Sequence, residues 1–166
     1  MEVDWVNGAF LMVKKSAIEK AGLLDEDFFL YAEEIEWCSR LRKTGKMCIY
    51  GDLHVIHMMG VTANQVFKSA SAGYKELGDK KGYQLILSGL VRVRKQFGAG
   101  WFLFHFAAYL FTIPFYLIVV LFRNIFFLPH ANFQWKEWWG FTKNVVGIFP
   151  FLSRILGNKP TFYKVL

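Results

Sequence analysis

The chain has 166 residues, enough for one ordinary hydrophobic core, and 54% of them are hydrophobic and 19% aromatic. This is more apolar surface than a water-soluble domain of that size hides, so part of it is expected to contact lipid or a partner. The net charge of +7 would suit nucleic acid, but much of the basic excess directly precedes an apolar run, which favours anionic lipid headgroups and argues against a nucleic-acid partner.

The first segment with a clear pattern is VDWVNGAFLMV at residues 3–13, whose continuous apolar character predicts a strand buried on both faces. Gly8 interrupts it and predicts a close approach of the backbone to another group. Ser16 is expected to cap a short helix over residues 17–21, which ends at Gly22.

Residues 25–31 (DEDFFLY) predict a loop that leads into a second helix over residues 33–44, ended by Gly45. The first turn of this helix is acidic and its last turns are basic, so both ends complement the helix dipole. Residues 47–50 and 53–57 are expected to form two short strands.

Residues 64–99 predict basic, amphipathic helices with breaks near three glycines, Gly73, Gly78 and Gly82. Residues 101–122 contain no Asp, Glu, Lys or Arg, and because about 20 apolar residues span a bilayer core, we expect a transmembrane or membrane-embedded segment.

Pro114 would kink such a helix without excluding it, and basic residues on both sides leave its orientation open. Two alternatives remain: residues 101–128 could enter and return as a hairpin with the Trp-rich stretch 133–141 along the interface, or the helix could be buried in a soluble core.

The acidic helix start has a chemical interpretation. The helix dipole favours ionised carboxylates, while their mutual repulsion and nearby aromatic rings raise one pKa, and a general base can result. The bland alternative is that acids at a helix start only stabilise the helix. The carboxylates concerned are Glu33, Glu34 and Glu36.

Three blocks within residues 3–60 resemble, in order and spacing, the second half of the catalytic domain of family 2 glycosyltransferases. These blocks are DWVNGAFLMVKKSAIEKAG, LLDEDFFLYAEEIEWCSRLRKTG and HVIHMMG. The resemblance implies an α/β fold with part of a mixed sheet of the GT-A type. A looser similarity to rhamnosyltransferase-like members extends through the basic helices and the apolar tail.

Residue by residue, the resemblance implies that Glu34 is the catalytic base, which takes a proton from the acceptor hydroxyl during inverting transfer. His57 stands where some relatives contact the diphosphate or its metal, although a histidine at a strand end also has a structural explanation, and support for His54 is weaker. Substrate-binding positions are implied at Trp5, Gly8, Ala9, Asp27, Phe29, Glu33 and Glu36. Trp5 could equally be a core residue and Asp27 a turn former.

The family's nucleotide-binding half, with its Asp-x-Asp motif for a divalent cation, has no counterpart ahead of residue 3. Asp25 and Asp27 match that motif by letters only, because they lie in the predicted substrate loop. The resemblance therefore implies a nucleotide-sugar donor and Mg²⁺ or Mn²⁺ in a full-length enzyme, with the nucleotide-binding half as a missing partner.

By resemblance, the reaction is transfer of a sugar such as rhamnose to a lipid-linked or cell-surface polysaccharide acceptor at the cytoplasmic face of the membrane. A non-catalytic membrane anchor of a split enzyme is the main alternative, and a small transporter component is a third. Four segments follow: 1–63 as the catalytic part, 64–99 as basic amphipathic helices, 100–128 as the membrane segment, and 129–166 as an aromatic and basic interfacial tail.

Overall fold

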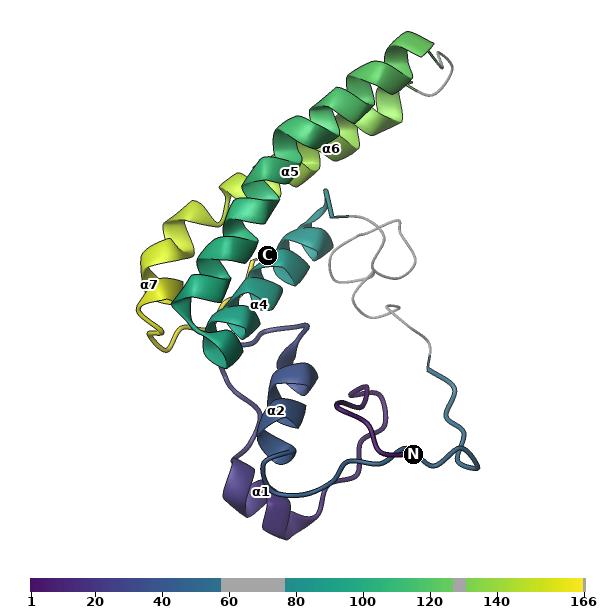
Figure 1. Cartoon of the computed structure of the whole chain (residues 1–166), viewed down its shortest axis with the longest axis vertical. Coiled ribbons are helices and arrows are strands. Elements are labelled where there is room, and N and C mark those ends of the chain that lie inside the picture. The colour runs from purple at the N-terminus through teal and green to yellow at the C-terminus, as the bar shows by residue number, and fades with distance from the viewer. Residues whose placement is uncertain (58–76, 127–130, 166) are drawn as a thin grey trace.

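A computed structural model of the chain describes residues 1–57, 77–126 and 131–165. Figure 1 shows a small amino-terminal unit beside a longer body built from the later helices. The helices are α1 (Lys15–Ala21), α2 (Glu33–Leu41), α4 (Lys80–Phe97), α5 (Ala99–Phe126), α6 (Ala131–Val146), the 3-10 turn η2 (Phe149–Phe151) and α7 (Leu152–Leu156).

The expected mixed sheet of the GT-A type is wrong for the described residues, which are helical and form no strand. Their β pairing is limited to two isolated bridges, Glu2 with Cys48 and Phe28 with Tyr163. The two predicted strand regions 3–13 and 47–50 do meet, but only through bonds such as Val3 N–H to the Met47 carbonyl at 3.0 Å.

The physical reason is the lack of neighbours. A buried strand needs hydrogen-bond partners on both edges for its N–H and C=O groups, and a single two-strand contact is marginal. In the described chain, residues 53–57 form no β-bridge with either region and are exposed; Leu53 N–H only closes a turn onto the Tyr50 carbonyl. The apolar pattern of these segments thus indicates that they favour strands, but the described residues provide no neighbouring strands with which they could form a sheet.

The two short amino-terminal helices follow the predictions more closely. The helix expected over residues 17–21 forms as α1 and ends at Gly22, which adopts a left-handed φ of +79°. Ser16 lies inside the helix, so its predicted capping role is wrong. The helix expected over residues 33–44 forms as α2, which ends at Leu41 and continues as turns to Thr44.

The basic segment forms one helix where the described residues cover it. Asp79 caps α4, and its carboxylate accepts the backbone N–H of Gly82 at 2.7 Å. Gly82 therefore lies in the first turn, and the predicted break there is wrong. A Cβ at this position would come within 2.4 Å of Leu77 Cα, so close packing explains the glycine. The expected helix over residues 64–76 and the break near Gly73 lie outside the described residues.

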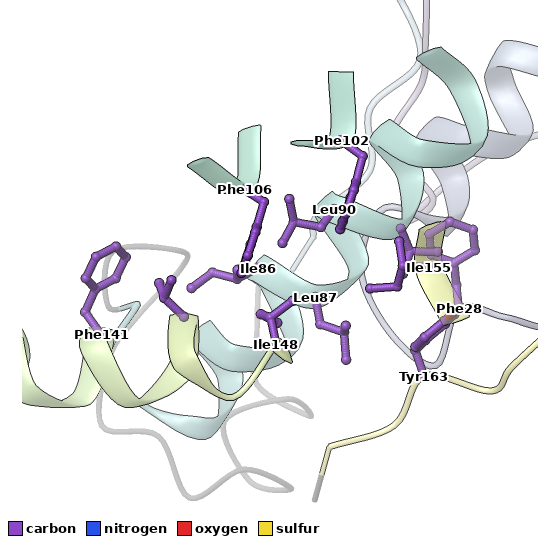
Figure 2. Packing of buried hydrophobic residues seen from close by; sticks show 12 residues of the cluster. Phe28, Ile86, Leu87, Leu90, Phe102, Phe106, Phe141, Ile148, Ile155 and Tyr163 are labelled. Atoms are coloured by element: carbon purple, nitrogen blue, oxygen red, sulfur yellow. The ribbon is translucent and has the colours of Figure 1, made fainter. Parts of the chain in front are cut away.

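One hydrophobic core joins α4, α5, α6 and the carboxyl-terminal tail (Figure 2). Because α4 buries an apolar stripe, it can pack against both α5 and α6. The buried members of this core are Phe28, Ile86, Leu87, Leu90, Val91, Phe102, Phe106, Phe141, Val145, Ile148, Ile155 and Tyr163.

The apolar segment forms a single helix, α5, through Pro114 to Phe126, so a hairpin contained within residues 101–128 is wrong. The return is made by α6, which runs antiparallel to α5 (Figure 1). The indole of Trp138 donates to the Ile113 carbonyl at 3.0 Å, and the rings of Tyr109 and Phe141 lie 6.3 Å apart.

The outer face of α5 remains apolar and exposed. The helix is long and apolar enough to cross a membrane, and only 11% of its most apolar stretch is buried. That fraction argues against the alternative of a buried helix in a soluble core. The largest exposed side chains on this helix are Trp101, Phe104, Phe111, Phe115, Ile118, Phe122 and Ile125.

A polar row on α4 attaches the amino-terminal unit to the body. Gln84 Nε2 donates to the Tyr163 carbonyl at 2.9 Å, and Ser88 Oγ donates to the Leu30 carbonyl at 2.7 Å. Lys95, on the same helix face, pairs with Asp25 at 2.5 Å and with Asp27 at 2.7 Å.

Asp27 is the centre of this attachment because it also holds the tail. It is only 8% exposed, its carboxylate accepts the Thr161 N–H at 2.8 Å, and its carbonyl accepts the Tyr163 N–H at 3.0 Å. Burial disfavours the charged forms of Asp25 and Lys95, but the ion pair between them stabilises these forms by more than burial costs. The pKa of Asp25 is therefore lowered, and that of Lys95 is raised.

Replacing Lys95 with Ala is expected to destabilise the fold by about 3 kcal/mol, because the buried Asp27 carboxylate would lose its cation. Denaturant unfolding in detergent measures the loss. Lys80→Ala is the matched control, since Lys80 is an exposed lysine at the other end of α4 and its loss should change little. Equal stability of the two variants would contradict the role of the Lys95 pair.

Candidate active site

Two carboxylates stand at the start of α2, where the chain reverses direction. Tyr31 and Ala32 immediately before the helix have left-handed φ values of +69° and +68°. Such backbone is uncommon outside glycine and costs about 1–3 kcal/mol per residue, so the surrounding contacts must hold it. The reversal places Glu33 and Glu34 in the first helical turn, at the positive end of the helix dipole.

Gly8 lies directly against Glu34. A Cβ on Gly8 would be 3.4 Å from Glu34 Cβ and 3.7 Å from its Cγ, so the backbone at Gly8 passes close to this side chain. The backbone turn at Gly8 is stabilised by Asn7, whose side-chain oxygen accepts the Ala9 N–H at 2.9 Å. The close approach predicted for Gly8 is therefore present, and its partner is the first turn of α2.

Cys38 holds the same two segments together one turn later. Its side chain is fully buried, and its Sγ lies 3.7 Å from the Val6 carbonyl. Burial raises the pKa of this thiol, with the negative charge of Glu34 adding to the effect, so Cys38 is a packing residue here. The amino-terminal segment thus contacts α2 at two successive turns, Val6 against Cys38 and Gly8 against Glu34.

Glu33 differs from its neighbour in its surroundings. Its Oε2 atom is buried and has no hydrogen-bond partner within the described ranges. Burial raises the pKa of Glu33, and the adjacent Glu34 charge raises it further, against a bond from its own backbone N–H. The sequence predicted that one carboxylate of this cluster would have a raised pKa, and the residue concerned is Glu33.

Glu36, the third acid of the cluster, is occupied elsewhere. Its carboxylate accepts Arg40 Nε and Nη2, both at 2.8 Å, and is only 6% exposed. Arg40 in turn donates to the Ala21 carbonyl at 2.6 Å and the Leu23 carbonyl at 2.9 Å. This pair fastens α2 to the end of α1 and does not join Glu33 and Glu34.

The two residues predicted for the substrate loop contact the carboxyl-terminal tail. Asp27 is bound to Lys95 and Thr161 as described above. Phe29 meets Phe162 edge to face at 5.6 Å, and the Lys164 ammonium lies 5.0 Å from the Phe29 ring. The tail, over 130 positions away in the sequence, gives no local signal of this contact.

The other predicted positions lie on the surface. Trp5 is 45% exposed, which is inconsistent with a core position, and Ala9 is exposed. His54 and His57 are exposed as well, and His57 stands at the edge of a described range. Within the described residues, no three His, Cys, Asp or Glu side chains gather as metal ligands would, so the metal role of His57 stays a prediction.

Part of the sequence is similar to two glycosyltransferases. A 41-residue segment is 46% identical to the low-salt glycan biosynthesis hexosyltransferase Agl10 of Haloferax volcanii, covering 25% of this chain and 13% of that protein. A 48-residue segment is 38% identical to the N-acetylglucosaminyl-diphospho-decaprenol L-rhamnosyltransferase of Mycobacterium tuberculosis, covering 29% of this chain and 16% of that protein.

These partial matches show a glycosyltransferase-like region in the chain. No protein-family model and no solved structure matches the chain. The matched segments span less than a fifth of either relative.

Glu33→Gln is expected to raise the melting temperature at pH 7 but not near pH 4. Because the pKa of Glu33 is raised in the folded protein, its contribution to folding stability is fully present below the ordinary pKa of 4.5. This contribution is lost as the pH rises through the raised pKa. Glutamine does not ionise, so the variant does not lose this stability at pH 7. Glu19→Gln, at an exposed site on α1, is the control and should leave the pH profile unchanged. Parallel profiles for Glu33→Gln and the wild type would show that Glu33 is not desolvated.

Proposed function

We propose that this chain forms the acceptor side of a membrane-bound, inverting glycosyltransferase of family 2, with Glu34 as the general base. The proposal rests on one observation above all: two adjacent carboxylates at a helix start, of which one is desolvated and the other half-exposed beside Gly8. The partial similarity to a hexosyltransferase and a rhamnosyltransferase supports the same chemistry.

The division of roles follows from the surroundings of the pair. Desolvation raises the pKa of Glu33 and so favours its neutral form, and the negative charge of the adjacent Glu34 adds to this effect. When Glu33 carries a proton, the negative charge of the pair is on Glu34, which is reachable from solvent. Glu34 can then accept the proton of an acceptor hydroxyl while that oxygen attacks the anomeric carbon and the nucleoside diphosphate leaves.

The donor is bound elsewhere in this proposal. The matched relatives are much longer than the segments they share with this chain, so a nucleotide-binding half has room outside those segments. That half would hold the nucleotide sugar and a Mg²⁺ or Mn²⁺ ion on its diphosphate. Rhamnose or another hexose is the donor sugar that the names of the relatives suggest.

The hairpin of α5 and α6 supplies the membrane attachment. An exposed apolar helix of this length is best satisfied by lipid, which would keep the acceptor side at the cytoplasmic surface of the membrane. A lipid-linked acceptor fits this placement, and the name of the mycobacterial relative includes such a lipid. A saccharide acceptor at the cell surface is the other option.

Glu34→Gln is expected to abolish sugar transfer and leave donor binding intact, because the amide cannot accept the hydroxyl proton. The assay combines this chain with a separately produced nucleotide-binding half and measures transfer of radiolabelled sugar to lipid acceptors. Glu19→Gln is the control at an exposed site on α1. Normal turnover by Glu34→Gln would reject the base and favour the non-catalytic membrane anchor.

The double variant Phe111→Glu/Phe115→Glu is expected to reduce membrane association more than tenfold. These side chains are 76% and 67% exposed on α5, and a charge in the bilayer core costs about 3 kcal/mol per residue. Flotation of the freshly translated chain with vesicles measures the bound fraction. Met12→Glu/Ile56→Glu adds the same charge at exposed apolar sites of the amino-terminal unit and should leave binding unchanged.

A further inference from the structure

An open cavity of about 530 Å³ lies between α2 and the last turns of α4, on a different side of α2 from Glu34. Ile35 and Ser39 on α2, together with Lys43 in the turn that follows this helix, line one wall. Glu34 and Cys38 instead contact the segment at Val6 and Gly8. The cavity is therefore separate from the carboxylate pair, although one helix forms part of both.

The lining of this cavity has an excess of positive charge. Five of the lining residues are basic and two are acidic. Three of the bases have acidic partners: Arg40 pairs with Glu36, Arg42 with Asp4, and Lys95 with Asp25 and Asp27. Arg92 and Lys43 remain, and neither forms an ion pair with any residue that the structure describes.

Of these two bases, Arg92 is partly buried, whereas Lys43 is exposed. Its Nη1 donates to Gln96 Oε1 at 2.9 Å, and Gln96 Nε2 reaches the Ile35 carbonyl at 3.3 Å, which fixes both side chains against α2. Burial lowers the pKa of Arg92, with no carboxylate in the described chain to oppose the effect. A guanidinium has five N–H donors, so most of the hydrogen-bonding capacity of Arg92 is not used by the described residues.

We infer that this cavity binds the phosphate group of a membrane lipid, held by Arg92 and Lys43. A guanidinium presents two parallel N–H groups that match phosphate oxygens, and the Lys43 ammonium, which lines the same cavity, adds a second positive charge. The cavity is larger than a phosphate, and its apolar walls at Trp5 and Phe97 leave room for the group attached to it.

The position of the cavity selects a lipid as the source of the phosphate. Phe97 ends α4 and is 56% exposed, and after one glycine the chain enters α5, whose exposed apolar face begins at Trp101. A bilayer that covers this face would bring its headgroups to the level of the cavity. Assigning the phosphate to the acceptor rests on the proposed function, whereas binding of the lipid phosphate does not.

The test measures binding of short-chain phosphatidic acid to the whole chain in detergent micelles by titration calorimetry. Arg92→Gln is expected to weaken binding at least about tenfold, and Lys43→Gln about threefold, because Lys43 is more exposed. Lys80→Gln is the matched control: it removes the same charge from an exposed site 12 positions earlier on α4, about 18 Å away along the helix.

Short-chain phosphatidylcholine and pyrophosphate are the comparison ligands. Weak binding of both supports a site for the phosphate of an anionic lipid, whereas pyrophosphate binding as tight as that of phosphatidic acid overturns the lipid as source. Equal weakening by Arg92→Gln and Lys80→Gln overturns the site itself. Circular dichroism checks folding, and if Arg92→Gln does not fold, Lys43→Gln against Lys80→Gln decides. No donor sugar is present, so this result and the transfer assay can fail independently.

Discussion

The pairing of Lys95 with Asp25 and Asp27 is the interaction on which the rest of the structure depends. It joins the loop before α2, the end of α4 and the tail at Thr161, three segments far apart in the sequence. Two carboxylates and an ammonium lose water there, which costs free energy. That cost is offset because each buried Asp27 oxygen has a partner: Lys95 and the Thr161 N–H for the carboxylate, and the Tyr163 N–H for the carbonyl. Without this attachment the loop, and with it the start of α2, would keep the Ser88 bond to the Leu30 carbonyl and the Phe28 side chain in the core, but its buried Asp27 carboxylate would have no cation.

The same attachment gives α2 its two functional sides. The helix is held at one end by the pair of Glu36 and Arg40 and along its length by α4. One side then presents Glu34 to the backbone at Gly8, and another side lines the cavity together with Arg92. The proposed proton transfer and the proposed phosphate binding are thus positioned by the same helix, which keeps the two groups of residues in fixed positions relative to each other.

Local patterns in the sequence predicted what local physics decides. The acidic start and basic end of α2 and the uncharged run of α5 identified both helices, because dipole complementarity and apolar length act within one segment. The mixed sheet was wrong because strand pairing depends on partners that the described chain lacks. Asp27 interacts with Lys95, almost 70 positions away, and with a tail still further along, so its burial could not be foreseen. Glu36 is different, since its partner Arg40 lies four positions on and was visible in the helix itself.

The distribution of charge along the hairpin bears on how it meets lipid. The outer face of α5 has no charged residue from Trp101 to Phe122, while α6 places Glu137 3.2 Å from the Tyr116 hydroxyl, about 25 Å along α5 from its first residue. A carboxylate at that depth is costly in the middle of a bilayer unless it faces protein or water. The hairpin is therefore two-sided, with apolar α5 outward and the polar contacts between the helices. The proposed immersion through the α5 face satisfies this pattern and would put the first turn of α5, which follows the end of α4, at the level of the headgroups.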